Sequence, residues 1–164
     1  SGNITGNKIS SYNEEGGISV YNNCTTGKIA NNTITDTRKN GKHTNLAGIK
    51  INLKSTTGSM TGNKILSGAA KYSSNRGIVL YNSSKVKGSI NKNTIEKCSD
   101  SAIVVSLKSQ VTGSVNGNKI SSAAKYGIQT LNKSSIGKAI ASNTIKNAKT
   151  SGILIGSISN TLNP

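Results

Sequence analysis

The chain has 164 residues and contains no tryptophan, no phenylalanine and a single proline. Hydrophobic residues make up only 32% of it, whereas a globular core of this size draws on more large apolar side chains. No run of about 18 apolar residues occurs, which excludes a membrane-spanning helix. The single histidine, His43, excludes a metal site built from several histidines. These deficits favour an architecture that needs only a thin apolar strip.

Acidic residues are also scarce, with 5 Asp and Glu against 21 Lys and Arg, so the formal net charge is +16. Such a charge fits an acidic partner or substrate, or simply a soluble surface. Nucleic acid is the less favoured partner, because aromatic residues make up 3% of the chain and no recognised nucleic-acid-binding motif occurs. The lysines are also spread over the whole chain and do not form one block.

Glycine, asparagine, serine and threonine fill much of the remainder, and they recur with a period. The motif Gly-x-Ile-x-x-Asn-x-Ile first covers residues 2–9 and then returns along the chain, with its asparagines 25 to 31 residues apart. These asparagines are Asn7, Asn32, Asn63, Asn93, Asn118 and Asn143. Self-similarity at this period is the signature of a stacked repeat, so we expect one solenoid over residues 1–164. Because the chain starts inside a repeat, we expect a module of a larger protein.

A second motif, Gly-Ile-x-(Val/Ile/Leu), recurs once per repeat, as in residues 17–20 and 77–80. Its alternation predicts a first strand with one buried face, and the segments around Ile29 and Ile34 predict a second and a third strand. Three short strands per turn without helical segments predict an all-β fold, a right-handed parallel β-helix of about six coils. Equivalent isoleucines from successive coils should then stack inside.

The asparagines fall at the bend between the second and third strands. There each side-chain amide can bond to backbone groups and to the amide of the next coil, which predicts an internal asparagine ladder. We expect the glycine before each first-strand isoleucine to adopt positive φ. The two cysteines, Cys24 and Cys98, lie about three coils or ~14 Å apart, too far for a disulfide, so we expect two small, partly buried thiols.

These motifs resemble the right-handed parallel β-helix superfamily of pectate lyases, polygalacturonases and alginate epimerases, over almost the whole chain. In character the sequence is most similar to the non-catalytic β-helix carbohydrate-binding modules appended to xylanases in gut-type bacteria. That resemblance implies a secreted bacterial protein, a xylan or other plant polysaccharide ligand, and no cofactor. It also implies that further modules of the same polypeptide are partners. Fold alone does not establish an activity.

The outward positions of the first strands supply a candidate binding face. Tyr21 and Tyr81 share a register two coils, or about 9.6 Å, apart, with Lys50 and Asn52 between them. Tyrosine rings stack on sugars, while amides and ammonium groups bind hydroxyls and uronates. The flanking candidates are Gln129 on the same face and Arg38, Tyr72 and Arg76 in two longer inserts before the first strands. Inserts on one face of a solenoid often mark its binding face.

None of these outward positions is acidic, whereas hydrolysis needs two carboxylates and calcium-dependent elimination needs acidic ligands. The acidic residues fall in turns, where Glu14, Glu15 and Asp36 could form a cluster for metal or acid–base chemistry. We therefore expect a non-catalytic module. Two alternatives stay open: a structural segment of a bacterial surface adhesin or fibre, and a fragment of a polysaccharide lyase or epimerase with its acids elsewhere.

Overall fold

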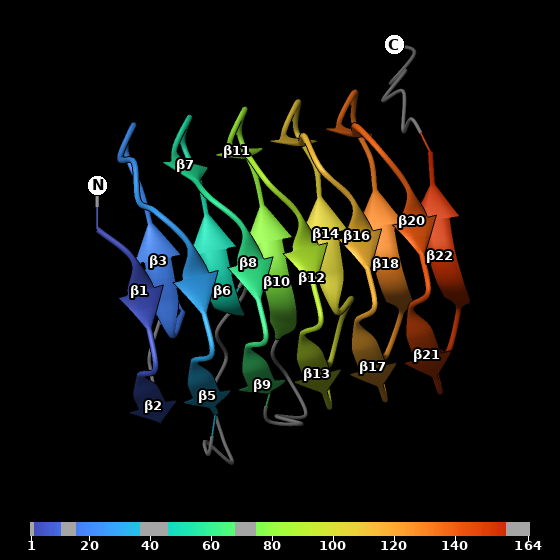
Figure 1. The fold of residues 1–164 in the computed structure, drawn as a ribbon. Coiled ribbons are helices and arrows are strands. Elements are labelled where there is room, and N and C mark those ends of the chain that lie inside the picture. Colours follow the sequence, from blue (N-terminus) through green and yellow to red (C-terminus); the bar gives the residue numbers. More distant parts are fainter. Residues whose placement is uncertain (1, 11–15, 37–45, 68–74, 157–164) are drawn as a thin grey trace, which may run out of the picture.

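The structure, a computed structural model, describes residues 2–10, 16–36, 46–67 and 75–156. The chain winds into a parallel β-solenoid in which each coil pairs with the coils before and after it (Figure 1). Every strand pairing is parallel. The all-β parallel β-helix predicted from the repeat is confirmed.

Three sheets of six strands form the walls, one for each strand predicted per coil. The first-strand sheet contains β3 (Ile18–Val20), β6 (Ala47–Ile51), β10 (Arg76–Leu80), β14 (Ile103–Val105), β18 (Tyr126–Thr130) and β22 (Ser151–Ile155). The second-strand sheet contains β1 (Ile4–Thr5), β4 (Ile29–Ala30), β8 (Met60–Thr61), β12 (Ile90–Asn91), β16 (Val115–Asn116) and β20 (Ile140–Ala141). The third-strand sheet contains β2 (Lys8–Ser10), β5 (Thr33–Thr35), β9 (Lys64–Leu66), β13 (Thr94–Glu96), β17 (Lys119–Ser121) and β21 (Thr144–Lys146).

A fourth, narrower sheet lies between the first and second strands of the middle coils. Its strands are β7 (Thr56–Thr57), β11 (Lys85–Val86), β15 (Gln110–Val111) and β19 (Ser135–Ile136). Each of these strands is two residues long and contributes one inward side chain, such as the fully buried Val86 and Val111. The sequence did not indicate this sheet, because two residues are too few to show an alternation.

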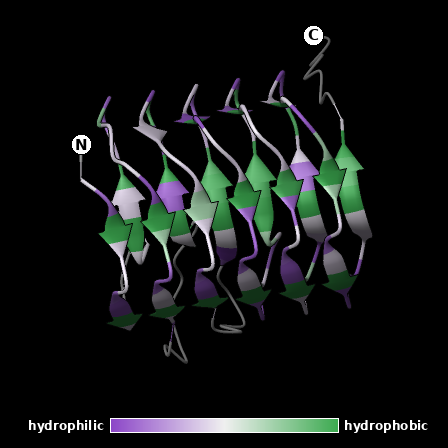
Figure 2. Cartoon of the chain, in the orientation of Figure 1, coloured by the Kyte–Doolittle hydropathy of each residue, from purple (hydrophilic) through white to green (hydrophobic). Residues whose placement is uncertain are grey.

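The core consists of stacked aliphatic side chains from equivalent positions of successive coils. Ile49, Ile78, Ile103 and Ile128 of the first-strand sheet are all fully buried and in register. Figure 2 shows the apolar residues of each coil concentrated in the strands. β-Branched side chains suit this wall because they pack closely on a pleated surface. A thin apolar strip per coil therefore suffices, which explains the low hydrophobic content.

The predicted asparagine ladder runs through all six coils. Each Nδ2 donates to the Oδ1 of the next ladder asparagine, over 2.8 Å from Asn7 to Asn32 and 2.9 Å from Asn32 to Asn63. The ladder continues to Asn93, Asn118 and Asn143 over 2.9–3.0 Å. Each Oδ1 also accepts the backbone N–H of the preceding ladder residue. The buried amides are thus satisfied by each other and by the backbone.

The bends are made by left-handed residues at fixed places. The residue before each ladder asparagine has positive φ, from 53° at Ser142 to 71° at Gly6. A pair of left-handed residues also follows the first strand, as at Asn82 (φ 53°) and Ser83 (φ 60°). The expectation of positive φ for the glycines before the first-strand isoleucines was wrong, since none of these glycines adopts it.

Three of those glycines, Gly48, Gly77 and Gly127, are required by close packing. A Cβ at Gly77 would lie 2.4 Å from Ile95 Cγ2, and one at Gly48 would lie 2.4 Å from Ile65 Cγ2. The third-strand isoleucine therefore fills the space that a side chain would need.

Both cysteines are free thiols, as expected. Cys24 is exposed, however, so the expectation that it is partly buried was wrong, whereas Cys98 is 3% exposed. Burial raises the pKa of the Cys98 thiol to about 12, although a hydrogen bond with Ser67 lowers it and the charge of Asp100 adds to the rise.

Candidate functional site

The outer face of the first-strand sheet is less open than the alternation predicted. Lys50 is only 8% exposed and Asn52 only 7%, so the expectation that they stand in solvent was wrong. Val79 and Val104, on the same face, are each 2% exposed and form a small apolar cluster with Ala47, against which Tyr81 packs. The middle of this face is thus a minor second core.

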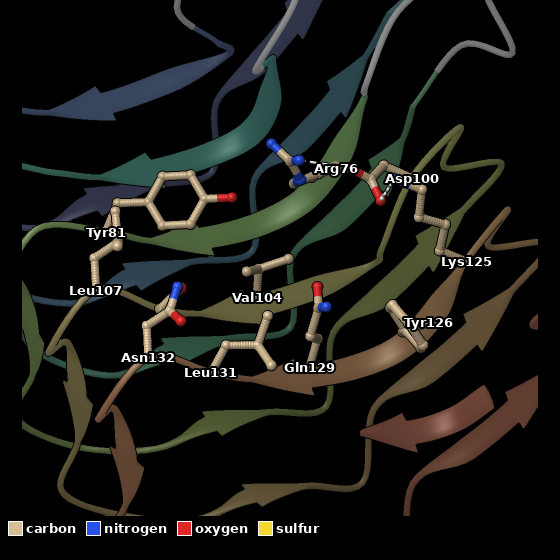
Figure 3. A pocket seen from close by; sticks show the side chains of 11 residues that line it. Arg76, Tyr81, Asp100, Val104, Leu107, Lys125, Tyr126, Gln129, Leu131 and Asn132 are labelled. Carbon is tan, nitrogen blue, oxygen red and sulfur yellow. Dashed lines mark hydrogen bonds and ion pairs between the residues drawn. The ribbon is translucent and has the colours of Figure 1, made fainter. Parts of the chain in front are cut away.

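The open part of the face lies over β10, β14 and β18, where a depression of about 470 Å³ is found. It is lined by Arg76, Tyr81, Asp100, Val104, Ser106, Leu107, Lys125, Tyr126, Gln129, Leu131 and Asn132 (Figure 3). The charged side chains of Arg76, Asp100 and Lys125 gather along one side of it, whereas Gln129 lies on another side near Leu131. Val104 and Leu131 supply apolar surface. A mixed lining of this kind is typical of ligand sites.

Asp100 is the centre of the charged side. It pairs with the Arg76 guanidinium, and its Oδ1 lies 3.4 Å from Lys125 Nζ. The Ser101 hydroxyl reaches both Asp100 Oδ1, at 3.3 Å, and Gln129 Oε1, at 3.1 Å. Asp100 is buried, while the side chain of Lys125 is 58% exposed. One buried carboxylate therefore holds Arg76 in place, while the ammonium group of Lys125 remains in contact with solvent.

Tyr81 forms the opposite side of the depression. Its ring centroid lies 5.8 Å from Arg76 Cζ, within the range of a cation–π contact. Burial raises the pKa of the Tyr81 phenol above 10.0, while Arg76 lowers it and Asp100 raises it further. The phenol is therefore protonated at neutral pH. Tyr81 thus offers a ligand both a hydrogen-bond donor and the face of its ring.

The predicted binding residues that the structure describes divide into four groups. Arg76, Tyr81 and Gln129 meet at the depression. Tyr21 is 38% exposed and keeps the predicted register with Tyr81 through the pairing of β3, β6 and β10, but it does not line the depression. Asn52 is occupied, because its Oδ1 accepts from Asn82 Nδ2 and from the backbone N–H of Leu53, both at 2.9 Å. Lys50 is buried, as described above.

The remaining predictions concern residues outside the described ranges. Arg38, Tyr72, Glu14, Glu15 and His43 all lie there, together with most of the two inserts. Of the proposed acidic cluster only Asp36 is described, and its Oδ2 accepts a 3.0 Å hydrogen bond from Asn75 Nδ2. Within the described part of the chain, no three His, Cys, Asp or Glu side chains come together.

Sequence reasoning missed Asp100 and Lys125 as site residues, because both precede their strands; Asp100 was assigned to a turn, and Lys125 was not singled out. A signal was available. Asn75, Asp100 and Lys125 are spaced by the 25-residue period of the later coils, so they fall at one height of the coil, and the bonds from Asp100 N to Asn75 O and from Lys125 N to Asp100 O confirm this stacking. Each lies two residues before the first residue of the Gly-Ile-x-(Val/Ile/Leu) motif, so extending the comparison of the coils to that position would have found them.

The described chain contains no helix with the length and hydropathy of a membrane span. No curated protein and no solved structure matches the sequence. Residues 1–145 match the model of a family described as "Right handed beta helix region", which fits the parallel coils and the asparagine ladder seen here. On this match, and on a fold that agrees with it coil by coil, the chain belongs to the right-handed β-helix family.

Proposed function

We propose that this β-helix is a non-catalytic polysaccharide-binding module and that the depression at Tyr81 is its sugar site. The observation that carries the proposal is the side-by-side placement of an aromatic ring and polar groups, with Arg76 and Tyr81 5.8 Å apart and Gln129 across the depression. Sugar rings stack on tyrosine through their C–H faces, and their hydroxyls bond to guanidinium, ammonium and amide groups.

The depression lies on the outer face of the first-strand sheet, so an extended polymer can cross it without being enclosed. Xylan is our favoured ligand, on the resemblance to the β-helix modules of xylanases. The same resemblance supports a bacterial, extracellular protein in which this module accompanies others. Tyr21, two coils away in the same register, would extend the contact along the polymer.

The position and partners of Asp100 favour ligand binding over catalysis. Among the described carboxylates, Asp100 is the one that lines the depression, and it is ion-paired with both Arg76 and Lys125. Glycosidases use two carboxyl groups on either side of the scissile bond. A single carboxylate between two cations instead fixes the positions of the binding groups.

The test is affinity electrophoresis of the unsubstituted protein, called the parent below, against arabinoxylan, glucuronoxylan, homogalacturonan, alginate, β-glucan and mannan. We expect retardation by the xylans that persists at moderate salt. Tyr81→Ala should reduce it at least about tenfold, as expected for loss of a stacking contact, while Tyr81→Phe retains most of it. Tyr21→Ala, which removes only the outer contact beyond the depression, should have the smaller effect.

Three results would contradict the proposal. Equal binding by Tyr81→Ala and the parent would show that the depression is not the sugar site. Absence of retardation by every polymer would favour the alternative of a structural segment of a surface adhesin or fibre. Release of reducing or unsaturated sugars during incubation would favour the alternative of an enzyme.

A further inference from the structure

Basic residues on the third-strand sheet follow a strict alternation. The position that precedes the inward isoleucine is lysine in β2, β9 and β17 and threonine in β5, β13 and β21. The pairings place these residues in register, in the order Lys8, Thr33, Lys64, Thr94, Lys119 and Thr144. In Figure 1 these strands lie side by side along the axis of the solenoid. We call Lys8, Lys64 and Lys119 the lysine row.

The lysine row faces solvent. The three lysines are exposed, whereas the isoleucines that follow them, Ile9, Ile65 and Ile120, pack in or against the core. The described ion pairs join Arg76 and Lys125 to Asp100 and do not involve the row. Within the described part of the chain, the side chains of the row also take part in no other ion pair or hydrogen bond. Three ammonium groups are therefore available to a ligand.

The spacing of the row is set by the backbone. Lysines two strands apart are separated by about 9.6 Å, and the whole row spans about 19 Å. A separation of about 9.6 Å, which is also the spacing of Tyr21 and Tyr81, approximates the length of two sugar units in an extended polysaccharide. The threonines between them place a hydroxyl beside the intervening sugar, where it can donate or accept a hydrogen bond.

We propose that the lysine row is a second binding surface, which takes a linear acidic polysaccharide lying along the solenoid axis with a carboxylate on every second sugar. Lys64 and Lys119 would each pair with one carboxylate, and Lys8 would extend the contact by a further repeat. This surface is formed by a different sheet from the Tyr81 depression, so the inference does not depend on the function proposed for that depression. Nucleic acid fits the row less well, because phosphates recur about every 3.4 Å along each strand of a duplex.

The test compares two triple variants that have the same net charge. One is Lys8→Gln/Lys64→Gln/Lys119→Gln, which removes the row. The control is Lys28→Gln/Lys54→Gln/Lys138→Gln, which removes three exposed lysines that lie elsewhere on the coils. The probes are hyaluronan, with a carboxylate on alternate sugars, polygalacturonate, with one on every sugar, and duplex DNA. Dissociation constants are measured by titration calorimetry at 0.15 M salt.

We expect loss of the row to weaken hyaluronan binding about tenfold, and the control triple to change it less than about threefold. Tyr81→Ala should leave hyaluronan binding intact, so failure of the sugar-site proposal and failure of this one can be told apart. Equal weakening by both triples would overturn the inference, because it would show that only total charge matters. Unchanged hyaluronan binding in the row variant, or a row-dependent preference for DNA, would overturn it as well.

Discussion

At the scale of single residues, the ladder asparagines stabilise the bend of every coil. The amide of Asn93 shows how: its Oδ1 accepts from the backbone N–H and from Nδ2 of Asn63, at 3.0 and 2.9 Å. Its Nδ2 donates to Asn118 Oδ1, at 3.0 Å, and to the backbone oxygens of Met60 and Asn91, both at 3.1 Å. Because the residue is fully buried, no water can take the place of these bonds.

Replacing Asn93 should therefore be costly. Asn93→Ala leaves the backbone N–H of Asn63 without its acceptor and removes one of the two bonds of Asn63 Nδ2, which keeps only the Ile29 oxygen. We expect a loss of about 2–5 kcal/mol in the free energy of unfolding, from two or more buried polar groups that lose a partner. Urea denaturation measures it. Asn143→Ala is the control, because Asn143 is only half-buried and water can reach the groups it leaves. Equal losses in the two variants would contradict a role that depends on burial.

The raised pKa of the buried Cys98 thiol predicts that the protein loses stability at alkaline pH. Its pKa is about 12 in the folded protein, against an ordinary value of 9.0, so the folded state holds the proton longer than the unfolded state. Below pH 9 both states keep the proton and Cys98 contributes no pH dependence. Between pH 9 and 12 the unfolded state releases it, and stability should fall by up to about 1.4 kcal/mol per pH unit.

Denaturation of the parent and of Cys98→Ala at pH 8 to 11 measures this effect. The stability difference between the two proteins should shrink as pH rises, because only the parent loses the contribution of the thiol. Lysine and tyrosine titrations are common to both proteins and cancel in the comparison. A difference that stays constant over this range would show that the thiol is accessible to solvent in the folded state.

At the scale of strands and turns, the first-strand glycine is fixed by a neighbouring strand. Gly77→Ala would bring Cβ within 2.4 Å of Ile95 Cγ2 and 2.6 Å of the Ala102 backbone oxygen. We expect a loss of about 1–3 kcal/mol, typical of overpacking, measured by urea denaturation. Gly152→Ala is the matched control at the same position of a later coil, where the nearest atom, Ile145 Cγ2, is 4.0 Å away.

The control variant should be near neutral in stability. A large loss in Gly152→Ala would mean that the backbone, and not the isoleucine, requires glycine at this position. Ala102 already occupies the equivalent place in one coil. Local adjustment of the coil can therefore make room for one methyl group, which keeps the expected loss at Gly77 moderate.

The elements that the sequence predicted are those with a repeated apolar signal. The stacks containing Ile78, Ile90 and Ile95 and the ladder at Asn93 recur in every coil, and so three sheets and one ladder could be read directly. The fourth sheet could not, because a pair such as Lys85 and Val86 is too short to show a period.

The candidate site was predicted only in part. Alternation identifies which side chains point outward but not how far neighbouring side chains cover them, which is why Lys50 and Asn52 were wrongly expected in solvent. Asp100 was missed for another reason: it precedes its strand, where no alternation marks the position.

At the scale of the whole molecule, the main feature is the excess of positive over negative charge. The net charge is +16, and the 5 carboxylates of the chain can neutralise few of its 21 Lys and Arg residues, as Asp100 does for Arg76 and Lys125. In a solenoid with strands about 4.8 Å apart, lysines of neighbouring coils lie within one Debye length at low salt, about 30 Å at 0.01 M, and are screened beyond about 8 Å at 0.15 M. Folding therefore works against repulsion that salt removes.

Thermal stability should accordingly rise with ionic strength. We expect the Tm to increase between 0.01 and 0.15 M NaCl, by roughly 2–4 °C for each kcal/mol of repulsion that is screened. Differential scanning calorimetry in NaCl measures the change. The two Lys→Gln triples described above provide the comparison: because each removes three positive charges, both should melt higher than the parent at 0.01 M salt and differ less from it at 0.15 M. A Tm that falls as salt is added would show that attraction outweighs repulsion among the charges. In that case the lysines would have partners that stabilise the coils, and the basic surface would not be free to bind acidic polymers.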